Sequence, residues 1–218
     1  MAKFLAFLLI FNFCYSNYSN ASTLNGKIIL KNSKGELENS DIETTLIYIA
    51  PLKNNQKFSI SKLVPKMEQK DKAFIPLVMP ILVNSTVEFN NLDPYMHNVF
   101  STSETKSFDL GLYKLGDKGK KIKFDKKGIV NIYCNIHEQM LGFIVVLDNP
   151  YFSMANKNGE YSLNLEKIPP GKIRVVAWHR FSGQQIQEVD LKSNEIKNIN
   201  FELTKNENVD MDKLKLLN

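Results

Sequence analysis

Residues 128–147 read GIVNIYCNIHEQMLGFIVVL, and this stretch decides the fold. Two apolar runs, at residues 128–133 and 141–147, flank a short polar segment. Both runs are rich in Ile and Val, which favour β-strands, and both have the length of a strand rather than of a helix. We therefore predict two strands joined by one loop, with Cys134 at the end of the first strand.

The chain on the N-terminal side of this hairpin has the same character. Further apolar or alternating runs lie at residues 74–83, 86–90, 108–113 and 121–124. Pro76 and Pro80 interrupt the first of these runs, which predicts an edge strand or a bend there. Short strands separated by turns, with no helix of useful length between them, predict an all-β sandwich or barrel.

The loop of the hairpin carries three soft metal ligands. Cys134, His137 and Met140 form the pattern C-x-x-H-x-x-M, and sulfur with imidazole suits copper better than magnesium or calcium. A trigonal site of two histidines and one cysteine, with a weak axial methionine, needs a second histidine. His97 follows the predicted strand at 86–90, and a sandwich can bring it to the loop. The sequence therefore predicts one copper ion held by His97, Cys134, His137 and Met140.

The segment from residue 74 to residue 147 resembles the cupredoxins, the blue copper proteins that include plastocyanin and amicyanin. H-N-V at His97 and C-x-x-H-x-x-M at Cys134 match the ligand pattern of that family. Stretches similar to the plastocyanin-like methylamine utilisation proteins lie at residues 74–76, 87–93, 106–110, 134–137 and 149–152. Gln139 departs from the aromatic residue that many relatives have before the methionine. The resemblance implies a Greek-key β-sandwich and the transfer of single electrons between a donor and an acceptor redox protein.

The resemblance also implies roles for residues around the ligands. Asn98 is similar to an asparagine that ties the two ligand loops by hydrogen bonds, with Asn135 beside the cysteine. His137, at the tip of its loop, is expected to be the more exposed histidine. Three apolar residues are candidates for the surface that docks a redox partner, and the sequence equally allows them as core residues: Met96, Ile136 and Leu141.

Two other functions stay open on the same residues. A copper chaperone or store would use the same ligands without electron transfer, and a structural β-protein would bury Cys134 without a metal. An enzyme is not expected, because the chain has three histidines, too few for a multicopper oxidase, and no orienting group supports Cys134 as a nucleophile. His179 has no cysteine near it and is expected to be a surface residue.

The composition indicates an exported globular protein. The net charge is +5, but the lysines are spread along the chain without interleaved aromatic residues, so we expect no nucleic-acid partner. Lys3, the apolar run 4–13 and the small residues after it predict a signal peptide over residues 1–21. The apolar run itself is too short to span a bilayer. Cleavage would leave no stable membrane span, although Cys14 keeps a lipid anchor open. We expect a periplasmic or secreted bacterial protein with Cys134 as its one cysteine.

The flanks of the cupredoxin-like segment predict a second module. Residues 26–28 with 34–35, and residues 158–161 with 168–171, resemble the two halves of a carboxypeptidase-regulatory-like β-sandwich. This implies that the two ends of the chain pair into one small sandwich, with the cupredoxin-like part inserted between them. The expected division is a signal peptide at 1–21, N-terminal accessory strands at 22–52, a cupredoxin domain at 53–148, C-terminal accessory strands at 149–204 and a charged tail at 205–218.

Overall fold

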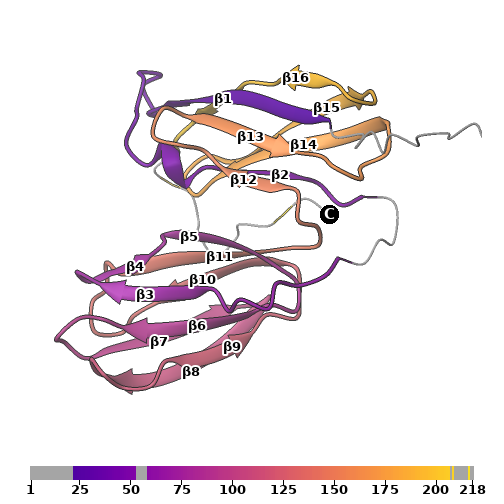
Figure 1. Ribbon diagram of the computed structural model, residues 1–218. Helices are drawn as coiled ribbons and strands as arrows, with labels where there is room; N and C mark the ends of the chain where they lie inside the picture. The colour runs from indigo at the N-terminus through magenta and orange to yellow at the C-terminus, as the bar shows by residue number, and fades with distance from the viewer. Residues whose placement is uncertain (1–21, 53–57, 207, 209–215, 217–218) are drawn as a thin grey trace, which may run out of the picture.

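The computed structural model describes residues 22–52, 58–206, 208 and 216 (Figure 1). The predicted signal peptide and most of the predicted tail lie outside these residues. Within the described residues every regular element is a strand except η1 (Ile42–Thr44), one turn of 3-10 helix. The predicted all-β class is therefore confirmed. None of the described segments forms a helix with the length and apolar character needed to cross a membrane.

The middle of the chain forms a sandwich of two sheets, drawn in the lower half of Figure 1. One sheet has the order β5 (Val78–Leu82), β11 (Leu141–Leu147), β10 (Gly128–Tyr133), β7 (His97–Ser103) and β8 (Lys106–Tyr113). The other has the order β4 (Ala73–Ile75), β3 (Lys66–Lys70), β6 (Thr86–Asn91) and β9 (Lys120–Lys123). We call this unit the middle sandwich.

Two features of the middle sandwich agree with the sequence. The predicted strands at 128–133 and 141–147 are confirmed as β10 and β11, paired antiparallel from Gly128 opposite Val146 to Tyr133 opposite Leu141. The proline-containing run is divided between β4 and β5, which are edge strands of different sheets. The chain bends from one sheet to the other at Pro76, as the prolines predict.

The two ends of the chain form a second sandwich, which we call the outer sandwich. One of its sheets contains β13 (Glu160–Asn164), β1 (Thr23–Lys31) and β16 (Ile196–Asn198), and β17 (Phe201–Thr204) also pairs with β1. The other has the order β12 (Phe152–Met154), β2 (Leu46–Ile49), β14 (Gly171–His179) and β15 (Gly183–Leu191). Both N-terminal strands thus pair with strands that follow residue 151, the pairing that an inserted middle sandwich requires. The exact domain limits stay a prediction.

The four sheets are stacked with an apolar layer in each of the three spaces between them (Figure 1). Strand β2 shows how this works, because Ile47 and Ile49 belong to the core of the outer sandwich while Leu46 and Tyr48 face the middle sandwich. Covering on both faces explains why β2 has no polar alternation. Strand β11 is covered in the same way, with Phe143 toward the outer sandwich and Ile144 in the core of the middle sandwich.

The layer between the two sandwiches, which we call the central layer, contains some of the largest buried side chains. Phe143 from β11 and Trp178 from β14 meet there with ring centroids 5.8 Å apart, and both are fully buried. Leu216, near the C-terminus, is buried in the same layer. Because β11 is packed on both faces, the loop that leads into it is attached to a rigid strand.

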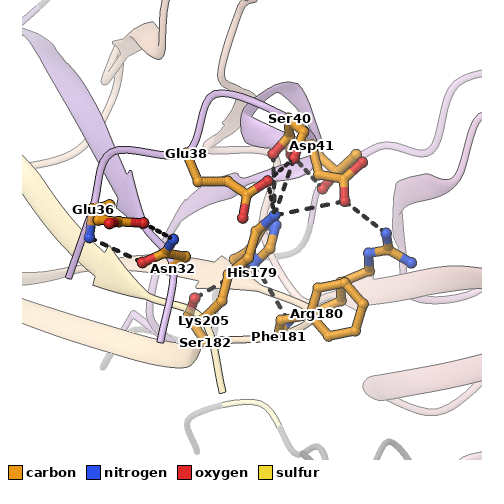
Figure 2. Close-up of polar contacts among 11 residues, drawn as sticks. Asn32, Glu36, Glu38, Ser40, Asp41, His179, Arg180, Phe181, Ser182 and Lys205 are labelled. Atoms are coloured by element: carbon orange, nitrogen blue, oxygen red, sulfur yellow. Dashed lines mark hydrogen bonds and ion pairs between the residues drawn. The ribbon is translucent and has the colours of Figure 1, made fainter. Parts of the chain in front are cut away.

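His179 corrects one prediction, since it is fully buried rather than a surface residue. Residues 38–41 from the N-terminal part of the chain and Lys205 from the C-terminal part close over the end of β14 (Figure 2). Arg180 donates a hydrogen bond to Asp41 at 2.8 Å. Burial, reinforced by the charges of Lys205 and Arg180, lowers the pKa of His179 to about 4. The covering segments are remote in sequence, so the local pattern around Trp178 could not reveal this burial.

Candidate metal centre

The four predicted ligands come from two strand ends at one end of the middle sandwich. His97 is the first residue of β7, and Cys134 directly follows β10. Tyr133, the last residue of β10, is paired with Phe100 of β7, so the ladder brings the two strand ends side by side. His137 and Met140 lie on the loop that leads into β11.

Three of the predicted ligands lie close together. The Nδ1 atom of His97 lies 3.7 Å from Sγ of Cys134 and 3.1 Å from Nδ1 of His137. The three donor atoms all lie within 4.8 Å of one another. An ion bonded at about 2.0 Å to nitrogen and about 2.3 Å to sulfur, the values for zinc, sets trigonal donors about 3.5 to 3.7 Å apart. The observed spacing therefore fits a single transition-metal ion with little movement of the side chains.

Burial differs among the four residues. His97, Cys134 and Met140 are buried, whereas His137 is partly exposed, so among the four predicted ligands His137 is the one in contact with solvent. Met140 and Cys134 belong to the same apolar core, and the backbone amide of Met140 donates to the carbonyl of His137 at 2.9 Å. The loop is thus closed by its own backbone, and the thioether and the thiol are buried in one core.

Asp93 holds the buried histidine, and sequence reasoning missed it. Nε2 of His97 lies 2.8 Å from Oδ2 of Asp93, and because an ionised carboxylate can only accept, this contact assigns the ring proton to Nε2 and directs Nδ1 toward Cys134. The carboxylate also accepts hydrogen bonds from the backbone amides of Asp71 at 2.7 Å and Lys72 at 2.9 Å. Burial alone would raise the pKa of Asp93, but the amide of Lys72, His97 and the amide of Asp71 together lower it below its usual value. Asp93 is four residues before His97, but only the fold reveals that the two meet.

The surroundings of the partly exposed His137 disfavour its protonated form. Partial desolvation lowers the pKa of His137, and the neighbouring His97 and Lys72 lower it further. A neutral imidazole is the form that binds a metal, so this environment favours ligation.

Asn98 links the two ligand loops. Its Oδ1 accepts a hydrogen bond from the backbone amide of Asn135 at 2.8 Å, and its Nδ2 donates to Asp109 at 3.0 Å. Asn98 is buried and directly follows His97, and Asn135 directly follows Cys134. The hydrogen bond between Asn98 and Asn135 therefore joins the two segments that carry these predicted ligands.

The apolar residues near His137 divide into two kinds. Met96 is 50% exposed and Ile136 is 49% exposed, whereas Leu141 is partly buried and packs against the central layer. Tyr95, which sequence reasoning did not name, is half-exposed, and its ring centroid is 6.4 Å from that of His137. Met96, Ile136 and Tyr95 thus offer apolar surface on segments next to the partly exposed ligand.

Comparisons with known proteins match only part of the chain. No family model matches it, and no curated protein matches it. Among solved structures, a copper-containing nitrite reductase from Thermus scotoductus SA-01 is 25% identical over 45% of this chain, with a TM-score of 0.38. A reduced Cu(I) form of an amicyanin mutant is 17% identical, covers 46% of this chain and 98% of its own, and has a TM-score of 0.37.

A purple cupredoxin from Nitrosopumilus maritimus is 22% identical, over 38% of this chain and 99% of its own, with a TM-score of 0.32. This chain spans 25% of the nitrite reductase chain that it matches. These neighbours of the chain among solved structures are cupredoxins, and each match covers less than half of this chain.

Proposed function

We propose that this chain is an exported type 1 copper protein that carries single electrons between a donor and an acceptor redox protein. One observation carries the proposal: a thiol and two imidazole nitrogens lie within 4.8 Å of one another at the end of a sandwich. We assign Met140, which is buried in the same core as Cys134, as the fourth donor. Copper, when bound by such a set, supplies a one-electron Cu(II)/Cu(I) couple.

The surroundings of the ligands favour a carrier over a chaperone or store. Asp93 fixes the ring of His97, Asn98 ties the two loops together, and Cys134 is buried in a packed core. Ligands that are held in this way move little between oxidation states, which favours fast electron transfer. A protein that delivers its metal to a partner needs ligands that the partner can reach, and only His137 is partly exposed.

The donor and the acceptor would both approach the face that contains His137. Met96 and Ile136 present apolar surface there, and we propose them as contacts for the partner. Leu141 supports the central layer, so we do not expect it to contribute to docking as strongly as the other two. In this proposal the bound copper would change oxidation state, and the protein would transform no substrate.

Copper titration with an absorption spectrum tests the proposal. Wild-type protein is expected to bind one equivalent of Cu(II) and to develop an intense visible band from charge transfer between the Cys134 thiolate and the metal. The Cys134→Ser variant is the control and should lack this band. Protein that takes up only Cu(I) and stays colourless would support a chaperone or store instead, and protein that binds no copper would contradict both.

A further inference from the structure

The turn between β3 and β4 contacts the surroundings of both histidine ligands. Asp71 and Lys72 form this turn, with φ values of 54° and 56°. Two successive residues with positive φ are typical of a tight two-residue hairpin turn. In this conformation both backbone amides donate to the carboxylate of Asp93, at 2.7 Å and 2.9 Å.

Through Asp93 the turn reaches the buried histidine. One carboxylate oxygen accepts from the amide of Asp71, and the other accepts from the amide of Lys72 and from Nε2–H of His97. The side chain of His97 is 0% exposed and that of Asp93 is 6% exposed. The carboxylate is therefore a buried negative charge whose position is fixed by three donors.

Through the side chain of Lys72 the same turn reaches the exposed histidine. The Nζ atom of Lys72 lies 5.0 Å from the ring centroid of Tyr95, a cation–π contact. The ring of Tyr95 in turn meets the ring of His137 edge to face. One hairpin turn thus contacts the neighbour of each imidazole.

We propose that Asp93 is a positioning residue that sets the reduction potential of the bound copper, an inference that rests on the proposed function. A carboxylate that accepts the second N–H of a ligating imidazole fixes the tautomer and makes the ring a stronger donor. A neutral acceptor would orient the ring without adding charge. The buried carboxylate also stabilises the higher metal charge of Cu(II) more than that of Cu(I), which lowers the potential.

The test compares two carboxylate-to-amide variants of the full chain. Asp93→Asn keeps an acceptor oxygen but removes the charge, and Asp125→Asn removes an equal charge at an exposed site paired with Lys106. We expect Asp93→Asn to keep the visible band and to favour Cu(I) at least tenfold more than wild type does, which is a rise of about 59 mV. The Asp125→Asn potential should stay near wild type. Equal potentials in the two variants would overturn the inference.

A conservative variant separates charge from shape. Asp93→Glu retains the negative charge with one more methylene and is expected to hold the potential closer to wild type than Asp93→Asn does. If the Glu variant rises as far as the Asn variant, charge is not the cause and the inference is wrong.

A metal-free measurement keeps this inference separate from the copper proposal. Nitrogen-15 NMR of the wild-type protein is expected to find His97 as the Nε2–H tautomer, with that proton protected from exchange by Asp93. An Nδ1–H tautomer would overturn the inference even if copper binds. If wild-type protein binds no copper, the proposed function fails, and Asp93 then has no potential to set.

Discussion

His97 and His179 are both fully buried, yet their polar neighbours differ. His97 donates a hydrogen bond to the carboxylate of Asp93. His179 lies near Lys205, Arg180 and Asp41 (Figure 2), and its burial, reinforced by the two cations and opposed by Asp41, lowers its pKa to about 4. The first environment fixes the orientation of an imidazole ring, whereas the second disfavours its protonation.

His179 should make the stability of the metal-free protein depend on pH. Its pKa is about 4 in the folded chain against 6.5 ordinarily, so protonation favours the unfolded state. This destabilisation is absent above pH 6.5, grows as the pH falls, and reaches about 3 kcal/mol near pH 4. Urea unfolding of wild type and His179→Gln at pH 7 and pH 4.5 measures it. The variant should lose less stability over this interval, and an identical loss would refute the assignment to His179.

At the scale of single elements, β10 and β11 could be read from the sequence because strand-forming residues fill both runs and the ligand loop interrupts them. The grouping of His97, Cys134 and His137 was also predictable, since two of them share one loop and His97 followed a predicted strand. Asp93 could not be predicted, because its role depends on a hairpin turn that meets it only after folding. The same holds for the layer that each apolar side chain enters, because alternation separates the two faces of a strand but does not say what covers them.

The bond between Asn98 and the amide of Asn135 should matter most for the loop that joins β10 to β11. Asn98→Ala removes the acceptor and leaves a partly buried amide unsatisfied, so we expect a loss of about 1 to 3 kcal/mol in the free energy of unfolding. Copper should also dissociate faster, since the two ligand loops are no longer tied. Asn158→Ala, at an exposed turn, is the matched control. Equal dissociation rates in the two variants would rule out a tying role.

For the whole molecule, the central layer decides whether the two sandwiches behave as one unit. Its side chains are buried between β2 and β14 on one side and β5, β10 and β11 on the other. A continuous apolar layer of this kind predicts cooperative unfolding, because separating the sandwiches would expose Phe143 and Trp178 to water.

This cooperativity can be followed with two independent signals. Trp178, the one tryptophan of the chain, reports on the outer sandwich and its contact with the central layer, and the copper band reports on the middle sandwich. Both should change at the same urea concentration in the wild-type protein. Phe143→Ala should lower stability by about 3 to 5 kcal/mol and separate the two transitions. Phe201→Ala, in the outer core, should lower stability without separating them. Separate transitions in the wild type would contradict a coupled molecule.

The pairing of β1 has a consequence for the order of events during biosynthesis. Among the described strands its partners are β13, β16 and β17, all of which leave the ribosome after the middle sandwich has been made. The earliest strand must therefore wait, unpaired, while the strands between residues 66 and 147 emerge and can already assemble. Closure of the outer sheet comes last, when β17 docks beside a strand synthesised at the start.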